Sequence, residues 1–69
     1  MSFTVKKKHH NRILDDHWYD IDVHSNELLR WILKQPQNAW YHIECINHTN
    51  TYIIHESLFN SIQLKWGDT

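Results

Sequence analysis

The stretch DDHWYDIDVHS, Asp15 to Ser25, decides the fold because its apolar and polar residues alternate. In an extended chain Tyr19, Ile21 and Val23 fall on one side, since successive side chains of a strand point to opposite faces. A period of two predicts a strand with one buried face. The other face is expected to meet water and carries Asp16, Trp18, Asp20, Asp22 and His24.

The aspartates conflict with the local propensity of this strand, because aspartate is disfavoured in β-structure. Such a conflict can mark a functional surface. An edge strand that uses charge to prevent aggregation explains it equally well. The sequence leaves both interpretations open.

Outward from this strand, the chain alternates again at Phe3 to Lys7, which predicts a short first strand. Residues 8–16 are mostly polar and are expected to form a turn or loop. On the other side, apolar residues at helical spacing predict a helix from Asn26 to Lys34. Ser25 suits the start of this helix and Pro36 discourages its continuation.

The second half of the chain predicts a hairpin with strands at Trp40 to Ile46 and Thr51 to Glu56. A last strand is expected at Ile62 to Trp66, after a turn. The predicted order is therefore β-β-α-β-β-β. A helix needs a sheet to cover its apolar face, so we expect a small α+β domain with a mainly antiparallel sheet and one helix packed on it. A small five-stranded barrel is the alternative.

A symmetric loop at Asn47 to Asn50 would fix the register of this hairpin. Cys45 would then lie in an apolar face, and His42 would pair with His55 on the opposite face, beside Trp40. Directly opposed side chains are close enough to share a metal ion or a proton, which would also make this face sensitive to pH. A slip of one residue removes the pair.

Length and composition predict a single domain of residues 1–69, with residues 1–2 and 67–69 frayed. Cys45 is the only cysteine, so no disulfide forms within the chain. A lone thiol, no signal peptide and no apolar run of ~20 residues predict a cytoplasmic protein that does not cross a membrane.

Charge and aromatic content shape the surface of this chain. The net charge of −1 divides into +4 over residues 1–12 and −5 over residues 13–69. The chain is histidine-rich and aromatic-rich, with seven histidines and four tryptophans. Protonation of all seven histidines would bring the charge to +6, so the charge changes between about pH 7 and pH 5. Aromatic side chains add buried volume to the core of a small protein, and they also anchor binding surfaces.

Metal binding and catalysis find little support. Neighbouring residues of a strand point in opposite directions, and the spacing of the histidines and aspartates in residues 9–17 matches no signature of metal ligands. We therefore expect no metal and no cofactor. Cys45 is expected in the core, and the serines near His55, Ser57 and Ser61, lack the glycines of a nucleophile elbow. We therefore expect no enzyme activity. The residues weighed as metal ligands are His9, His10, Asp15, Asp16 and His17.

Nucleic-acid binding is the main alternative function. Lys6, Lys7, Lys8 and Arg12 could contact phosphates while exposed aromatic rings stack on bases, as in small barrels that bind RNA or single strands. The acidic remainder of the chain and a pI near 6.6 oppose this interpretation.

The sequence favours a module that binds a protein, as an adaptor or as an inhibitor or regulator of a larger protein. Aromatic residues inside a charged rim suit protein interfaces. A small homo-oligomer also fits. The residues expected to bind the partner are Asp16, Trp18, Asp20, Asp22, Trp40, His42 and His55.

Overall fold

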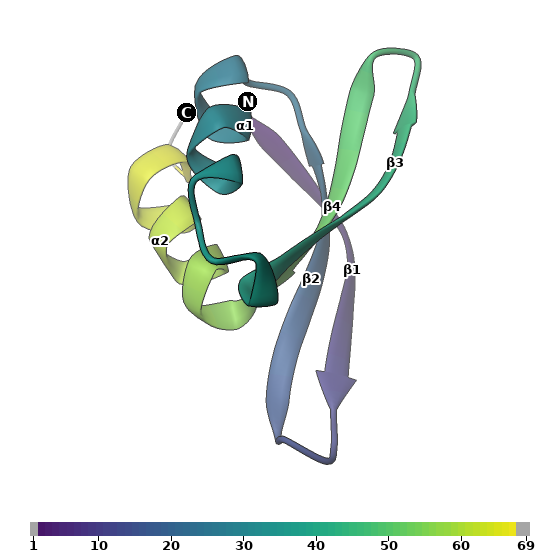
Figure 1. Cartoon of the computed structure of the whole chain (residues 1–69), viewed down its shortest axis with the longest axis vertical. Helices are drawn as coiled ribbons and strands as arrows, with labels where there is room; N and C mark the ends of the chain where they lie inside the picture. The colour runs from purple at the N-terminus through teal and green to yellow at the C-terminus, as the bar shows by residue number, and fades with distance from the viewer. Residues whose placement is uncertain (1, 68–69) are drawn as a thin grey trace.

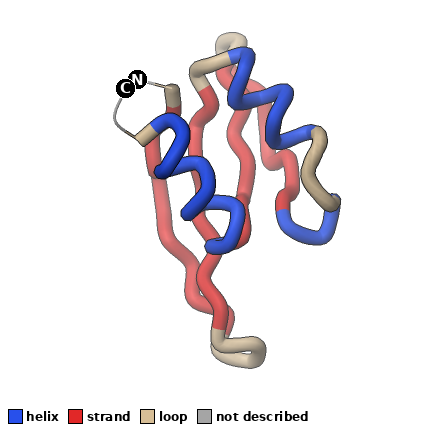
Figure 2. The backbone as a smooth tube through the Cα atoms, turned by 90° about the vertical axis from the view of Figure 1, so that its left-hand side faces the viewer, coloured by secondary structure: helices blue, strands red, loops and turns tan. Residues whose placement is uncertain are grey.

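The computed structural model describes residues 2–67, which form one sheet with helices on one side (Figures 1 and 2). The four strands are antiparallel and lie in the order β1-β2-β4-β3. A small α+β fold is therefore confirmed. In chain order the elements are β1 (Phe3–Asn11), β2 (Asp16–Val23), α1 (Asn26–Leu33), the 3-10 turn η1 (Gln37–Ala39), β3 (Trp40–Ile46), β4 (Thr49–His55) and α2 (Glu56–Trp66).

The chain is built from two units of the same order, each a hairpin followed by a helix. β2 and β4, the second strand of each hairpin, pair with one another in the middle of the sheet. Because they run antiparallel, the tips of the two hairpins project at opposite ends of the molecule (Figure 1). The predicted order of five strands and one helix is wrong in its last element, and the open sheet excludes the barrel alternative.

β2 forms where the alternating stretch predicts it, and its apolar residues face the helices. Ile21 is fully buried and Val23 nearly so. The strand lies in the interior of the sheet, hydrogen-bonded on both sides, with Tyr19 opposite Ile54 on β4. β2 is therefore not an edge strand, and protection of an edge does not explain its aspartates.

β1 is longer than expected, because it continues beyond Lys7 to Asn11. Residues 8–11, expected in the loop, pair with β2 instead, and His10 stacks on His17 with ring centroids 4.5 Å apart, whereas residues 12–15 form a turn as predicted. The turn that follows begins at Asn11, whose side-chain oxygen accepts the backbone N–H of Ile13 at 3.0 Å. Asp15 closes the turn with a positive φ of 52°.

α1 begins at the predicted residue and ends one residue early, at Leu33. The Ser25 side chain caps it by accepting the Leu28 N–H at 3.5 Å. Leu28 and Ile32, four residues apart, are fully buried against the sheet.

The hairpin of β3 and β4 is tighter than expected. Its turn has two residues, Asn47 and His48, both with positive φ, as a type I′ turn requires. A bulge between His42 and Glu44 shifts the register again. As a result His42 lies opposite Tyr52, so the predicted pair with His55 does not form. Cys45, expected in the core, is exposed near the hairpin tip.

The last segment forms α2, so the strand predicted at Ile62 to Trp66 is wrong. Phe59 and Ile62 are buried, three residues apart on one helix face, whereas Leu64 is 87% exposed. Five alternating residues fit either structure, and burial of a helix face against β2 and β4 decides between them.

The core lies between the sheet and the helices. Tyr19 stacks on Phe59 with ring centroids 4.0 Å apart, which joins β2 to α2. The ends of the described chain are hydrogen-bonded: the Ser2 carbonyl accepts the His24 N–H, and the Gly67 N–H donates to Gln63. The fraying expected of residues 1, 68 and 69 lies outside the described residues. The buried apolar residues are Ile21, Val23, Leu28, Ile32, Tyr52, Ile54, Phe59 and Ile62.

Candidate functional site

The sheet has one face packed against the helices, the covered face, and an opposite face that we call the open face (Figure 2). Alternation along each strand assigns residues to one face or the other. Ile54 is buried on the covered face, so its neighbour Ile53 points to the open face. The open face includes Lys6, Lys7 and His9 of β1 and, on the other three strands, Asp16, Trp18, Asp20, Asp22, Tyr41, Glu44, Ile46, Thr51, Ile53 and His55.

An aromatic cluster occupies the middle of the open face. The Trp18 ring lies 5.8 Å from the Tyr41 ring and 5.0 Å from the His55 imidazole. The Trp18 indole N–H donates to Asp16 Oδ1 at 3.3 Å. Tyr41 is 55% exposed, so the cluster presents an aromatic surface to solvent.

The aspartates of β2 all have partners on neighbouring strands. Asp22 Oδ1 accepts the Thr51 hydroxyl at 2.6 Å, and the Lys6 ammonium lies 4.0 Å away. The other two aspartates each have a carboxylate oxygen 3.1 Å from a histidine Nε2: Asp20 lies beside His9, and Asp16 lies beside His55. These carboxylates are only about one fifth exposed, so the expectation that they stand free in water is wrong.

Asp20 differs from its neighbours in one respect. Its Oδ1 is buried and accepts no hydrogen bond from the residues that the structure describes. His9 Nε2 lies 3.1 Å from this oxygen, but the ring N–H does not point at it, so the contact is electrostatic when His9 is protonated.

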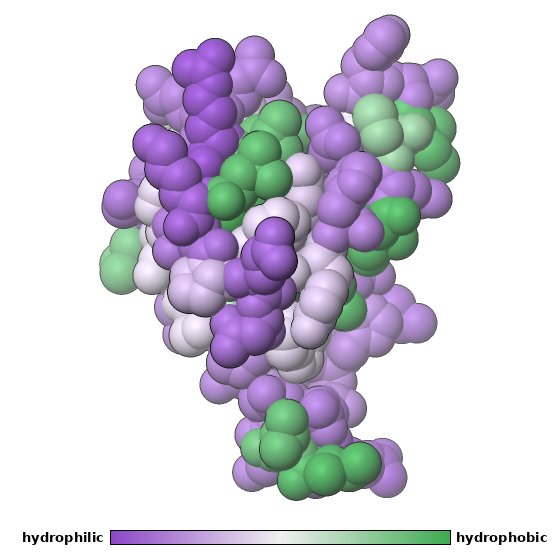
Figure 3. Space-filling view, in the orientation of Figure 1, coloured by the Kyte–Doolittle hydropathy of each residue, from purple (hydrophilic) through white to green (hydrophobic). Residues whose placement is uncertain are grey.

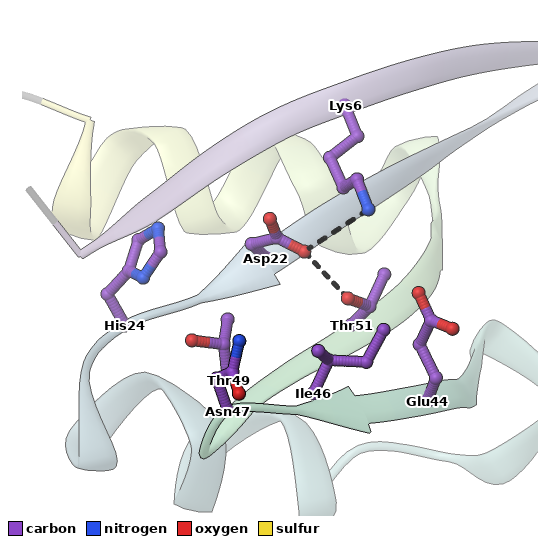
Figure 4. Close-up of a pocket in the computed structure, with 8 residues that line it drawn as sticks. All are labelled: Lys6, Asp22, His24, Glu44, Ile46, Asn47, Thr49 and Thr51. Atoms are coloured by element: carbon purple, nitrogen blue, oxygen red, sulfur yellow. Dashed lines mark hydrogen bonds and ion pairs between the residues drawn. The ribbon is translucent and has the colours of Figure 1, made fainter.

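A shallow polar groove lies at one end of the open face (Figure 4). It has a volume of about 280 Å³. Lys6 and Asp22 point toward each other across it, and Glu44 comes from the far side, on β3. Its lining residues are Lys6, Asp22, His24, Glu44, Ile46, Asn47, Thr49 and Thr51.

A second, more apolar cavity of about 450 Å³, also shallow and open to solvent, lies at the other end, between the open face, η1 and the start of α2. Trp18 and Leu58 are among its apolar walls. Three polar side chains at its edge are hydrogen-bonded in series: Asp16 to His55 at 3.1 Å, and His55 to Ser57 at 2.9 Å. The cavity thus combines an apolar space with a carboxylate, an imidazole and a hydroxyl.

Apolar side chains are also exposed on both hairpins (Figure 3). Ile13 and Leu14 at the tip of the β1–β2 hairpin are 93% and 70% exposed. On the β3–β4 hairpin, Ile43 and Ile46 are about half exposed.

The structure brings together five of the seven residues expected to bind a partner. Asp16, Trp18, Asp20, Asp22 and His55 share the open face. The other two residues lie on the helix side of β3, because the tight turn and the bulge change the register.

Trp40 is the first of these two, and it packs on Tyr52 with ring centroids 5.7 Å apart. Its indole N–H donates to the Gln35 carbonyl at 3.0 Å. The second, His42, lies 4.9 Å from the Tyr52 ring and within hydrogen-bond distance of Asn50. Tyr41 takes the place of Trp40 on the open face.

The residues weighed as metal ligands separate into pairs. His10 lies 3.0 Å from Asp15, and His17 lies 3.3 Å from Glu56 on α2. His9 and Asp16 belong to the open-face pairs. Within residues 2–67, no group of three histidine, cysteine, aspartate or glutamate side chains is placed to hold a metal ion.

The basic residues of β1 do not form one patch. Lys6 lies near Asp22, and Lys7 lies opposite Asp20, so both belong to the open face. The Lys8 ammonium instead lies 5.7 Å from the centre of the Tyr19 ring on the covered side. Arg12 is in the turn beyond them. The four cations that could contact a phosphate backbone are therefore divided among the open face, the covered side and the turn.

One pKa on the covered side departs from its usual value. Burial raises the pKa of the Tyr52 hydroxyl above 10.0, because the phenolate loses hydration, and the charge of the Cys45 thiolate adds to the effect. Tyr52 is thus held as a neutral core residue.

No protein-family model, curated protein or solved structure matches this chain. Among the described residues, no helix is long and apolar enough to cross a bilayer. The candidate site therefore depends on its own geometry alone.

Proposed function

We propose that this protein binds another protein through the open face of its sheet, as an adaptor or as an inhibitor or regulator of a larger protein. The observation that carries the proposal is the aromatic cluster of Trp18, Tyr41 and His55 on a face without a helix over it. Aromatic residues of this kind dominate the binding energy of protein interfaces.

The size of the face supports this proposal. A standard interface buries about 800 Å² on each partner, roughly one sixth of the 4898 Å² accessible surface of this chain. One face of a four-stranded sheet is of that order. Because Lys6, His9 and His55 already partner the aspartates, the expected attraction is aromatic and apolar contact with a polar rim, not a strong acidic field.

The test compares capture of a partner by three forms of the protein. Trp18→Ala combined with Tyr41→Ala removes the aromatic cluster, and Leu64→Ala removes an apolar side chain of α2 that is more exposed than either. We expect affinity for a partner, captured from extract and then purified, to fall roughly 30-fold or more in the double variant, the about 2 kcal/mol cost of a hot spot. The Leu64→Ala variant is expected to bind normally. Equal binding by both variants, with unchanged circular dichroism, would refute the assignment.

The nucleic-acid alternative is separated by tryptophan fluorescence. Because the basic side chains of β1 are divided between faces, we expect single-stranded RNA not to quench the emission in a salt-dependent way. Quenching that weakens between low and high salt would favour RNA instead.

A further inference from the structure

We propose that Ser57 is a nucleophile activated by His55 and Asp16, and that the adjoining cavity takes small esters with an apolar acyl group. The hydrogen-bonded series runs from Asp16 Oδ2 to His55 Nε2 at 3.1 Å, and from His55 Nδ1 to Ser57 Oγ at 2.9 Å. This inference adds a chemical activity to the proposed binding and departs from the expectation of a chain without catalysis. The series was hidden from sequence reasoning because Asp16 and His55 are 39 residues apart.

The hydrogen bonds fix which nitrogen of His55 carries the proton. The backbone N–H of Ser57 points at Nδ1 from 3.2 Å, and a backbone N–H can only donate. Nδ1 is therefore the unprotonated acceptor, and Nε2 carries the hydrogen that it donates to the Asp16 carboxylate. It follows that the Ser57 hydroxyl donates to Nδ1, which is the arrangement of a serine beside its general base.

Burial and packing hold this arrangement in place. The side chains of Asp16 and His55 are 18% and 26% exposed, and the Trp18 ring packs edge-on against the imidazole at 5.0 Å. Ser57 itself is exposed, so its hydroxyl is open to a substrate. Asp16 acts through His55 and is a positioning residue.

The surroundings determine the class of substrate. The cavity of about 450 Å³ is open to solvent and lined by both apolar and polar side chains, with neither lysine nor arginine among them, so it suits a short uncharged acyl chain. Ser57 stands in the first turn of α2, an 11-residue helix, where the positive end of the helix dipole favours a developing oxyanion, while its own backbone N–H is donated to His55 Nδ1. The lining residues are Leu14, Asp16, Trp18, Pro36, Asn38, Ala39, His55, Ser57 and Leu58.

The reaction balances with an ester and water as its only reactants. Ser57 Oγ forms a bond to the carbonyl carbon while its proton passes to His55 Nδ1. The bond between that carbon and the alcohol oxygen breaks, and the proton on Nδ1 goes to the departing alcohol. Water then attacks the acyl-serine in the same way, which releases the carboxylic acid and restores the hydroxyl of Ser57.

The experiment uses p-nitrophenyl butyrate and a fluorophosphonate with the full chain. The seven histidines hydrolyse activated esters to some extent, so the measured quantity is the rate in excess of the Ser57→Ala variant. We expect an excess in the wild type that His55→Asn lowers by about 100-fold or more, the low end of general-base catalysis. Asparagine keeps an acceptor at the start of α2, so this variant retains the helix cap. Ser61→Ala, one turn further along the helix, is the matched control and is expected to keep the full excess.

Two further readouts separate catalysis from a structural role. Asp16→Asn is expected to lower kcat for the ester while leaving KM nearly unchanged, because the amide no longer holds His55 in the tautomer whose Nδ1 is free to accept a proton. Mass spectrometry of the wild type is expected to place the phosphonyl group on Ser57. A rate equal to that of Ser57→Ala, or label on other residues with Ser57 unmodified, overturns the inference. The labelling result needs no variant, so it holds even where a variant fails to fold.

Discussion

The two faces of this sheet are made by alternate residues of the same strands, yet they hold together by different physics. On the covered face, Ile21 and Ile54 are fully buried against the helices and contribute through apolar burial. On the open face, the intervening residues partner one another across strands, as Asp22 does with Thr51. The comparison teaches that the polar face of β2 is not merely solvated, because its carboxylates are tied to neighbouring strands.

The largest expected difference between the faces comes from two adjacent residues of β4. Ile54→Ala removes a fully buried side chain and is expected to lower the free energy of unfolding by about 2–5 kcal/mol. Ile53→Ala, on the open face, is expected to cost about 1 kcal/mol or less. Urea unfolding of both variants checks this comparison. Equal losses would contradict the assignment of the two residues to opposite faces.

A smaller effect is expected from the hydrogen bond between Thr51 and Asp22. Thr51 is only 6% exposed, and Thr51→Val would leave the Asp22 carboxylate without its 2.6 Å donor. We expect a loss of about 1–3 kcal/mol, the cost of leaving a partly buried acceptor unpaired. Thr49→Val, two residues away on the same strand, is the control and is expected to change stability by about 0.5 kcal/mol or less. A neutral Thr51→Val would show that this bond does not contribute to stability.

The pH dependence of stability gives a third comparison. Because its pKa is raised, Tyr52 holds its proton more tightly in the folded protein than in the unfolded chain. Stability is therefore unaffected well below pH 10 and falls as the pH rises above about 10, where the unfolded chain ionises first. Tyr52→Phe cannot ionise, so the fall should be smaller in this variant. Thermal melting at pH 8 and above about pH 10 measures the difference, and parallel curves for both proteins would contradict it.

The smallest effect is expected at Lys6. Its ammonium lies 4.0 Å from Asp22 and its side chain is 48% exposed, so the attraction is screened by solvent. Lys6→Met is expected to change the free energy of unfolding by less than about 1 kcal/mol. Measurement at low and high salt checks this, since a large salt-dependent loss would mean that the open face depends on its ion pairs.

Regular alternation allowed the sequence to predict β2, with Ile21 inward and Asp20 outward, and helical spacing predicted α1 almost to the residue. The final segment was ambiguous, because Ile62 and Trp66 fit a short strand and a helix equally. Only packing of α2 on the sheet decides it. Propensity for strand or helix is local, whereas that packing is not.

The candidate site was harder to predict than the fold. A two-residue turn and a bulge decide on which face of the sheet Trp40 and His42 lie. A slip of the register by one residue moves a side chain to the other face. The pairing of β2 with β4, which brings Asp16 to His55, joins distant segments and leaves no local pattern in the sequence. The position of Trp18 on the open face was predicted correctly, because alternation along the strand is enough to place it there.

Site-specific photo-crosslinking tests the central claim most directly. A photoreactive phenylalanine derivative is placed at Tyr41 on the open face or, in a second protein, at Leu64 on α2, which is even more exposed. The account predicts that position 41 links one partner protein, that Trp18→Ala abolishes this product, and that position 64 does not link the same partner. Equal products from both positions, or a product from position 41 that persists without Trp18, would contradict it.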